Sequence, residues 1–274
     1  MSDRHAAWLQ ALAEAGVADP AGDLRRLFDW AYAQGQGDPA PQTRDRPNDW
    51  TLYTLEDAVK ARAARQPVSQ IIGRRAFFKH DFEVTPDVLD PRPDTETLVE
   101  VALAHPFDTV LDIGSGSGCI LLSLLAERPE ATGLGIDISA PALDVARRNA
   151  DRLGLAGRAR FRRSDWLAEV DEQFDLIVSN PPYIDAATYA TLAPELRDWE
   201  PRGALEAGAD GLDAYRVIAR DAPRVLAPGG TLCLEIGHDQ GRSVPALLAA
   251  SGWRQITVQR DLNCKDRVVT ANLI

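Results

Sequence analysis

The sequence has 274 residues, of which 45% are hydrophobic and 26% are charged, and it contains 30 Lys and Arg against 41 Asp and Glu. This composition is typical of a folded protein and excludes intrinsic disorder, while the net charge of −11 argues against attraction of the whole surface to nucleic acid or anionic membrane. No apolar run approaches the ~18 residues that a membrane-spanning helix needs, and the first residues lack the apolar stretch of a signal peptide, so we expect a cytoplasmic protein.

The cysteines are far apart in the sequence and form no C-x-x-C pair: Cys119, Cys233 and Cys264. The spacing offers no set of ligands for a zinc cluster, so no metal site is predicted. A reduced, cytosolic environment fits this pattern best.

The first ~75 residues have a helical pattern. Apolar residues recur at helical spacing after Asp23, a candidate N-cap, at Leu24, Leu27, Phe28 and Ala31. Residues 35–49 are rich in Gly, Pro and charge and indicate a loop, and Thr54–Asp57 resembles a capping box that opens a helix to about Arg65. Two interpretations remain open here, a helical addition that packs against the rest or a module that recognises a partner, and composition alone favours the first.

The pattern changes between residues 76 and 95. Aromatic and β-branched residues among polar ones predict a short hairpin within 76–88. The two prolines of residues 89–96, Leu-Asp-Pro-Arg-Pro-Asp-Thr-Glu, hold the chain extended, and Asp94 or Thr95 is placed to cap a helix that runs through Leu103.

From residue 109 onward, strands and helices alternate. Strands are predicted at 109–113, 132–136, 158–163, 174–179, 230–236, 255–259 and 267–273, and helices up to 128 and at 140–153, 215–226 and 244–250. Such alternation indicates a parallel sheet with right-handed crossovers. Arginines 158, 160 and 162 alternate along the third strand, which fits either a basic patch or, preferably, a solvated strand face.

A glycine-rich segment, Asp112-Ile-Gly-Ser-Gly-Ser-Gly118, ends the first of these strands. Glycines at a strand-to-helix turn allow a ligand close to the backbone, and the following helix N-terminus favours an anion. The dinucleotide fingerprint G-x-G-x-x-G would need glycine at position 119, where this chain has cysteine. A plain tight turn remains the alternative.

Acidic and aromatic residues follow the next two strands. Asp137 ends the second strand and can accept hydrogen bonds from both ribose hydroxyls of a nucleoside, unless it serves only as a helix N-cap, a role that Ser139 could fill instead. Asp165 and Trp166 follow the third strand, where a carboxylate can accept from an adenine amino group and an indole can pack on the ring. Taken alone, this loop could equally hold a partly buried tryptophan.

The fourth strand ends in Ser179-Asn-Pro-Pro-Tyr-Ile184, a pattern suited to methylation of a planar nitrogen. The side-chain oxygen of Asn180 and the carbonyl of Pro181 can each accept one N–H of an NH2 group. The two prolines remove competing backbone donors and stiffen the turn, and Tyr183 can stack on a flat amide or base. Such a clamp directs the nitrogen lone pair at a methyl donor.

With these motifs in order, the chain resembles class I methyltransferases that methylate amino groups. It is specifically similar to the HemK/PrmC family of protein-(glutamine-N5) methyltransferases, which modify peptide chain release factors. The likeness covers nearly the whole chain, more loosely over the first ~65 residues. The segments that carry it, besides the four motifs, are residues 66–73, 89–96, 200–205, 208–212, 234–241 and 260–268. Asp94 and Cys264 stand where the family commonly has Glu and Gly.

The resemblance implies an α/β fold: a Rossmann-like seven-stranded sheet with a small N-terminal helical domain, five-helix-like, and a β-hairpin linker. The corresponding domains are residues 1–75 for substrate recognition, 76–95 for the linker and 96–274 for the methyltransferase. The implied cofactor is S-adenosyl-L-methionine, with S-adenosyl-L-homocysteine as product. The implied substrate is the glutamine of a Gly-Gly-Gln loop.

The resemblance also implies a role for each motif residue. Those expected to bind the cofactor are Gly114, Ser115, Gly116, Ser117, Gly118, Asp137, Asp165, Trp166 and Asn180. Those expected to bind the glutamine are Asn180, Pro181, Pro182 and Tyr183, of which Asn180, Pro181 and Tyr183 are the expected catalytic residues.

A primary amide nitrogen is barely basic, because its lone pair is delocalised into the carbonyl. We hypothesise that no side chain removes a proton before transfer and that the proton leaves after the methyl arrives. None of the histidines, at 5, 80, 105 and 238, is near Asn180 in the sequence.

Three alternatives stay open. An adenine-N6 nucleic-acid methyltransferase also uses Asn-Pro-Pro-Tyr, although the net charge of −11 and the lack of a basic domain argue against it. A ribosomal-protein glutamine is another possible acceptor. A non-catalytic cofactor-binding regulator would be expected to have a degenerate clamp. We expect a monomer that contacts neither nucleic acid nor membrane directly.

Overall fold

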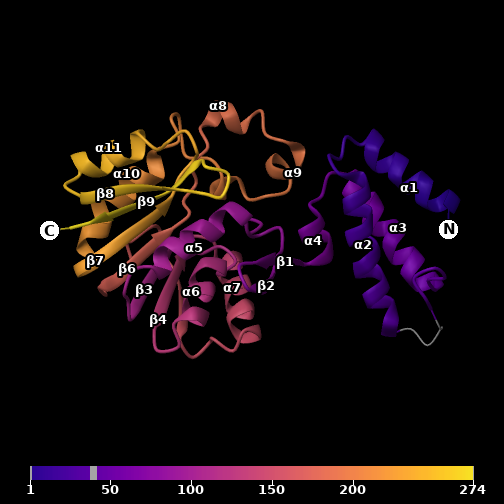
Figure 1. The fold of residues 1–274 in the computed structure, drawn as a ribbon, viewed down its shortest axis with the longest axis horizontal. Coiled ribbons are helices and arrows are strands. Elements are labelled where there is room, and N and C mark those ends of the chain that lie inside the picture. The colour runs from indigo at the N-terminus through magenta and orange to yellow at the C-terminus, as the bar shows by residue number, and fades with distance from the viewer. Residues whose placement is uncertain (1, 38–41, 274) are drawn as a thin grey trace. The chain divides into compact units, whose positions relative to one another are not determined.

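The computed structural model describes residues 2–37 and 42–273, which divide into two compact units. The first unit holds the chain up to Arg74 together with the later segment Ala193–Trp199, and the second holds residues from Arg75 to Leu192 and from Glu200 onward (Figure 1). Of the loop expected at 35–49, residues 38–41 lie outside the described part. The inclusion of Ala193–Trp199 in the first unit is not indicated by the sequence pattern.

The first unit is helical. Its described elements are α1 (Ser2–Glu14), α2 (Pro20–Gln34), the 3-10 helix η1 (Gly35–Gly37), α3 (Asp49–Ala63), α4 (Val68–Ile72) and α9 (Pro194–Arg197). Its core contains the fully buried Leu12, Leu27 and Leu55 from the three longest helices. The described part of residues 2–74 thus contains four α-helices, and α9 comes from far along the chain.

Both predicted N-caps in this unit are wrong. Asp19 caps α2 by accepting from the Gly22 N–H at 2.9 Å, because Pro20 is suited to the first helical position. Asn48 caps α3 by accepting from the Thr51 N–H at 2.9 Å, so Thr54 lies within the helix.

Asp23, no longer a cap, is instead part of a buried ion-pair network. It accepts from Arg62 at 2.7 Å, and Arg62 also reaches Glu195 of the later segment at 3.0 Å. Arg65 adds a second contact to Glu195 at 2.6 Å. These charges tie Ala193–Trp199 to the helices of its own unit.

The second unit begins at Arg75, within the hairpin of β1 (Arg74–Phe77) and β2 (His80–Glu83). Its remaining strands are β3 (Thr109–Ile113), β4 (Thr132–Asp137), β5 (Ala159–Arg163), β6 (Phe174–Ser179), β7 (Leu226–Glu235), β8 (Arg254–Arg260) and β9 (Asp266–Asn272). Its α-helices are α5 (Glu96–Leu103), α6 (Cys119–Glu127), α7 (Ala140–Arg152), α8 (Ala186–Tyr189), α10 (Asp213–Asp221) and α11 (Ser243–Ala250). Three 3-10 helices complete it: η2 (Pro93–Thr95), η3 (Arg202–Ala204) and η4 (Ala222–Arg224).

Seven strands form one sheet in the order β5-β4-β3-β6-β7-β9-β8. The expected parallel arrangement is confirmed for the five strands from β3 to β7, whereas β9 runs antiparallel to both β7 and β8. The exception arises because β8 and β9 are joined by a short turn instead of a crossover helix.

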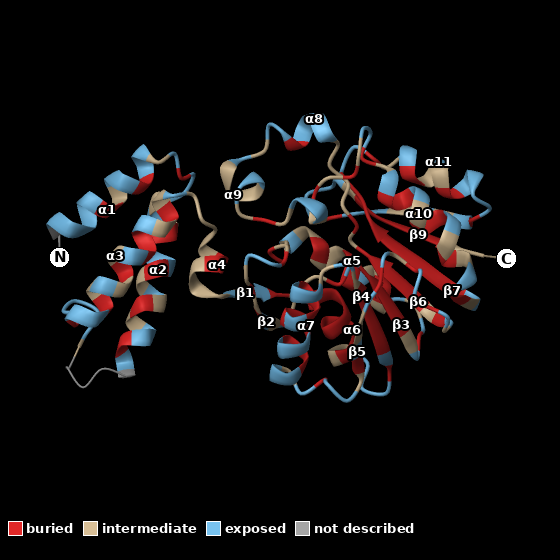
Figure 2. Cartoon of the chain, turned by 180° about the vertical axis from the view of Figure 1, so that it is seen from behind, coloured by how far each residue is buried: buried red, intermediate tan, exposed pale blue. Residues whose placement is uncertain are grey.

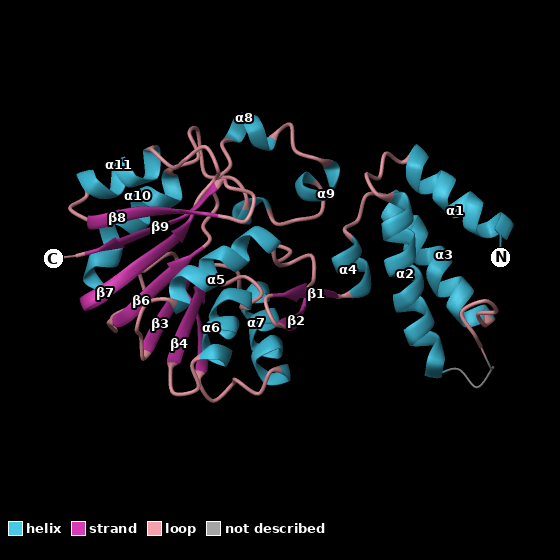
Figure 3. Cartoon of the chain, viewed as in Figure 1, coloured by secondary structure: helices cyan, strands magenta, loops and turns pink. Residues whose placement is uncertain are grey.

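Helices cover both faces of this sheet (Figure 3). Alternate strand residues point to opposite faces, so Leu111 and Ile113 pack with α10 and α11 while Val110 packs with α5 and α6. The central strands of the sheet are accordingly largely buried, whereas the edge strands β5 and β8 are more exposed (Figure 2). The fold is the seven-stranded, Rossmann-like arrangement that the sequence predicts.

One boundary prediction and one capping prediction in this unit are wrong, although α5 ends at Leu103 as expected. The helix expected at 215–226 ends at Asp221, because Pro223 has no N–H to continue the α-helical hydrogen bonds, and the chain continues as the 3-10 helix η4. Neither Asp94 nor Thr95 makes a side-chain cap for α5, and Asp94 instead pairs with Arg267 at 3.1 Å.

The three alternating arginines, Arg158 just before β5 and Arg160 and Arg162 within it, all contact neighbouring groups. Arg158 donates to the carbonyls of Leu125, Arg128 and Ala131, and Arg162 pairs with Glu172 at 2.7 Å. No helix within residues 2–37 and 42–273 is long and apolar enough to cross a membrane.

Candidate active site

A cavity of about 390 Å³ opens at the carboxyl ends of β3, β4, β5 and β6. The strand register creates it: Ile113 of β3 lies beside Ile136 of β4 and Ser179 of β6, so the residues that follow all emerge at one edge of the sheet. The motif residues that line the cavity are Gly114, Gly116, Asp137, Asp165, Trp166, Asn180, Pro181 and Pro182. Four motif residues do not line it: Ser115, Ser117, Gly118 and Tyr183.

The glycine-rich turn between β3 and α6 forms one wall. Gly114 and Gly116 have φ of 73° and 53°, in the left-handed region that glycine adopts without strain. The Gly116 N–H donates to Asp137 at 3.0 Å, and the buried Ser115 donates to Asp112 Oδ2 at 2.7 Å behind the wall. Ser115 therefore stabilises the turn from inside, while Gly114 and Gly116 face the cavity.

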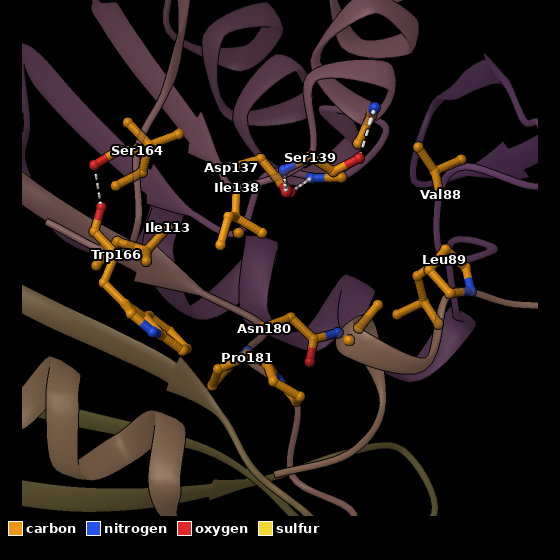
Figure 4. Close-up of a pocket in the computed structure, with 18 of the residues that line it drawn as sticks. Val88, Leu89, Ile113, Asp137, Ile138, Ser139, Ser164, Trp166, Asn180 and Pro181 are labelled. Atoms are coloured by element: carbon orange, nitrogen blue, oxygen red, sulfur yellow. Dashed lines mark hydrogen bonds between the residues drawn. The ribbon is translucent and has the colours of Figure 1, made fainter. Parts of the chain in front are cut away.

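Asp137 lies at the end of β4 with both carboxylate oxygens in use. One accepts from Gly116 and the other from the Ser139 N–H at 2.9 Å, and Ser139 itself caps α7 (Figure 4). Asp137 is thus not the N-cap. Each carboxylate oxygen retains a second lone pair, so the group can still accept hydroxyl donors.

Trp166 and Asn180 lie on other walls of the same cavity (Figure 4). Trp166 has a φ of 50°, which is uncommon for a bulky residue, and its carbonyl accepts from Ser164 Oγ at 2.5 Å. The partly buried indole also packs against the core, whereas neighbouring Asp165 is exposed. The strained backbone and the serine contact fix the ring at the cavity.

Asn180 and the two prolines follow β6 directly. Ser179 Oγ donates to the Ile113 carbonyl at 2.6 Å and holds the strand end, and Asn180 Nδ2 donates to Thr95 Oγ1 at 3.1 Å. Pro181 and Pro182 have no N–H, so their part of the cavity wall offers carbonyl acceptors without competing donors.

Tyr183 packs against the core beside this wall. Burial, with the nearby charge of Glu235, raises the pKa of its hydroxyl to about 12. Its carbonyl accepts from Gln240 Nε2 at 3.2 Å, which helps to hold the turn.

Two buried carboxyl groups lie close to these motifs. Burial raises the pKa of Asp112 and of Glu235 to about 7 each, although the hydrogen bond from Ser115 opposes the shift at Asp112 and the nearby polar groups of Thr95 and Asn180 oppose it at Glu235. Both lie behind the cavity wall and neither lines it.

Sequence reasoning missed several residues that support the site. Buried Asn149 of α7 donates to the Ser117 carbonyl at 2.9 Å and accepts from the Glu83 N–H at 2.7 Å, so it links the glycine turn to the hairpin. Val88 and Leu89, after the hairpin, line the cavity (Figure 4). Nothing local in the sequence marks Asn149 or Val88, because their roles depend on partners distant in the chain, and Leu89 lies in the 89–96 segment to which no site role was assigned.

Comparisons with known proteins agree with this geometry. Residues 88–196 match the family model described as "Methyltransferase small domain". The release factor glutamine methyltransferase of Cereibacter sphaeroides is 54% identical over 265 residues, which cover 96% of this chain and 94% of the relative. That of Caulobacter vibrioides is 44% identical over 271 residues, with 96% and 94% covered.

The chain belongs to the release factor glutamine methyltransferase family. It is therefore an S-adenosylmethionine-dependent methyltransferase, as the motifs predict. A methyltransferase from Pyrococcus furiosus has a related structure, with a TM-score of 0.54 and 18% identity, covering 72% of this chain and 90% of that one. At that identity the likeness concerns the fold alone.

Proposed function

We propose that this enzyme transfers the methyl group of S-adenosylmethionine to the side-chain nitrogen, N5, of the glutamine in the Gly-Gly-Gln loop of peptide chain release factors. The observation that carries the proposal is that one cavity joins the glycine turn, Asp137 and Trp166 to Asn180 and Pro181. The names of the close relatives support the same acceptor.

The cavity wall has the groups that this cofactor requires. The glycine turn at the start of α6 can receive the methionine carboxylate, and Asp137 has lone pairs for the ribose hydroxyls. Trp166, with Asp165 beside it, is assigned to the adenine. When bound, the sulfonium supplies an electrophilic methyl carbon.

Asn180 and Pro181 are assigned to the glutamine amide, and Asn180 also borders the cofactor. Their oxygens accept the two N–H groups, which holds the amide and turns its lone pair toward the methyl group. Pro182 continues this wall, and Tyr183 beside it remains the proposed contact for the flat face of the amide.

No general base is assigned. None of the four histidines lines the cavity formed by the described residues, and Tyr183, with its pKa raised to about 12 by burial, stays protonated at neutral pH. We infer that positioning and hydrogen bonding drive the transfer, and that the proton leaves the nitrogen afterwards.

The release factor must present its loop to this cavity, and we assign its recognition to residues 1–75, with residues 76–95 as linker to the methyltransferase domain. The net charge of −11 argues against attraction of the whole surface to nucleic acid. We further propose a cytoplasmic monomer, since translation termination takes place in the cytoplasm.

The proposal is tested with labelled S-adenosylmethionine and purified release factor. A matched release factor with the glutamine of Gly-Gly-Gln replaced is the control, and a DNA duplex and ribosomal proteins are assayed in parallel. Label in the wild-type release factor alone is the expected result. Label in DNA or a ribosomal protein instead would leave the fold and cofactor assignments in place but would contradict the proposed acceptor.

A further inference from the structure

A buried glutamine amide joins three backbone segments next to the Asn-Pro-Pro-Tyr turn. Gln240, which follows β7, is 8% exposed and does not line the cavity. Its Nε2 donates to the carbonyls of Tyr183 at 3.2 Å and Gly211 at 3.0 Å, and its Oε1 accepts from the Gly237 N–H at 3.0 Å. Each partner is a backbone group that can act only as donor or only as acceptor, so the amide makes these bonds in one orientation alone.

The Tyr183 carbonyl lies at the far end of the turn that lines the cavity. Ser179 Oγ holds the near end by donating to the Ile113 carbonyl at 2.6 Å. The two prolines between these ends have no N–H, so they cannot anchor the turn with backbone donors of their own. Gln240 therefore holds the turn at the first carbonyl that follows the prolines.

Gly211 belongs to a second segment that reaches the cavity. The residues of that segment that line the cavity are Pro201, Gly203 and Ala204. Further along, it pairs with the chain that leaves the turn, where the Ile184 N–H donates to the Leu205 carbonyl at 3.0 Å. Because Gln240 bonds to both segments, it holds the two parts of the cavity wall together.

The two segments approach so closely that the contact requires glycine. Gly211 has a φ of 70°, and a Cβ placed on it would lie 2.4 Å from the Tyr183 carbonyl oxygen. Any side chain at this position would push the carbonyl away from its place. The glycine and the glutamine thus act on the same oxygen atom.

We propose that Gln240 is a positioning residue for methyl transfer, which holds the turn at 180–183 and the segment at 201–211 in the arrangement that receives the substrate amide. The inference rests on the proposed function, because this turn is the assigned glutamine site. The three residues that Gln240 contacts are not among those assigned to the cofactor. Loss of its hydrogen bonds should therefore slow transfer and leave cofactor affinity in place.

The first test replaces Gln240 by Glu, which has the same length and can still accept from Gly237. As a carboxylate it has no hydrogen to donate to the two carbonyls. Single-turnover transfer at saturating release factor and the Kd for S-adenosylmethionine are measured on the same preparation. We expect transfer to slow by about tenfold while the Kd stays within about twofold. Gln240→Met, which brings no charge into the buried site, should show the same split.

Gly211→Ala tests the same carbonyl by a second route. Its Cβ would displace the Tyr183 oxygen, so we again expect transfer to slow by about tenfold with the cofactor Kd unchanged. Because both changes act on one carbonyl, the double variant Gln240→Met with Gly211→Ala should lose less than the product of the two single losses.

Gly154→Ala is the matched control. Gly154 also has a φ of 70°, but no atom lies within 4 Å of a Cβ placed there, and it does not line the cavity. The substitution strains the backbone in the same way and should leave the transfer rate at the wild-type value. Lower stability alone therefore cannot imitate the expected result.

Three outcomes overturn the inference. Gln240→Glu and Gln240→Met both transfer at the wild-type rate, or the cofactor Kd rises as much as transfer slows, or the losses of Gln240→Met and Gly211→Ala multiply fully in the double variant. Failure of the proposed function is distinct, because wild-type enzyme would then not methylate the Gly-Gly-Gln release factor at all.

Discussion

Asn180 ends β6 with its nitrogen bonded to Thr95 and its side chain at the cavity. Asn180→Asp keeps the shape but adds negative charge beside a cationic cofactor. We expect it to bind S-adenosylmethionine about tenfold more tightly and to transfer the methyl at least ~100-fold more slowly. Calorimetry and single-turnover kinetics check this.

S-adenosylhomocysteine, which lacks the positive charge of S-adenosylmethionine, is the control ligand for Asn180→Asp. Its affinity should change by less than about twofold, because it lacks the positive sulfur. Equal tightening of both cofactors would show that charge is not the cause.

Glu235 gives a prediction for stability against pH. Burial raises its pKa from 4.5 to about 7, so between these values the folded state holds a proton that the unfolded state has lost. Its contribution to stability is complete below pH 4.5 and disappears as the pH rises through 7.

Glu235→Gln cannot titrate, so its free energy of unfolding should fall less between pH 5 and 7.5 than that of the wild type, by up to about 3 kcal/mol. Denaturant unfolding at several pH values measures this. Asp112 and Glu200, whose pKa values burial also raises, are present in both proteins and cancel in the comparison. Parallel pH curves for the two proteins would contradict the assignment.

At the residue scale, the sequence predicts the cavity wall better than its support. Asp137, Trp166 and Asn180 are predictable because each follows a strand, where parallel sheets gather ligand-binding groups. Thr95 escapes detection because it contacts Asn180, a residue distant in the chain. Ser115 and Ser117 share the glycine turn, but only the structure shows that they point inward.

At the scale of elements, β4 supports the glycine turn from behind. A Cβ on Gly135 would overlap the Ser115 hydroxyl and come within 2.7 Å of the Phe161 ring. Gly135→Ala should therefore lower Tm by about 5 °C and weaken cofactor binding, because the turn must shift.

Gly157→Ala is the control for that prediction, since no atom lies within 4 Å of a Cβ placed there. Calorimetric melting and cofactor titration of both variants provide the measurement. Equal behaviour of the two variants would mean that β4 does not support the turn.

The elements themselves are largely predictable from their periodicity. Strands β3, β4 and β6 agree with expectation within a residue, because an apolar run followed by Gly, Asp or Asn marks both their core and their end. The N-caps of α2 and α3 are not predictable from the sequence. Several Asp, Asn and Thr residues lie near each helix start, and tertiary contacts determine which of them is the cap. Asp23 is the clearest case: its carboxylate pairs with Arg62 and does not cap the helix.

At the scale of the whole molecule, the chain that follows Asn-Pro-Pro-Tyr contributes Ala193–Trp199 to the first unit. Burial alone would raise the pKa of Glu195, but hydrogen bonds from Arg65 and Arg62 outweigh it and lower the pKa. Glu195→Ala removes the carboxylate that pairs with Arg65 and Arg62, although Arg62 still pairs with Asp23.

We expect Glu195→Ala to lower the free energy of unfolding by about 2 kcal/mol and to raise KM for the release factor more than the Kd for cofactor. Asp144→Ala, which breaks an exposed ion pair with Arg147, is the control. It should change the free energy of unfolding and the KM for the release factor only slightly. Denaturant unfolding and steady-state kinetics of the two variants provide the measurement. A Kd for cofactor that rises as much as KM would argue against a recognition role for the first unit.

The residue pattern predicts seven strands and the parallel part of the sheet, and the resemblance implies the same number. The place of β9 between β7 and β8 does not follow from local pattern, because it depends on which strand edges remain free. The membership of Ala193–Trp199 in the first unit likewise depends on ion pairs between residues more than a hundred positions apart.

The most direct test of the central claim, that Asn180 holds the substrate amide at a preformed cofactor site, is single-turnover methyl transfer by Asn180→Ala with cofactor affinity measured on the same preparation. We predict that transfer to the Gly-Gly-Gln release factor falls at least ~100-fold while the Kd for S-adenosylmethionine stays within about threefold. Full turnover with intact cofactor binding would contradict the account.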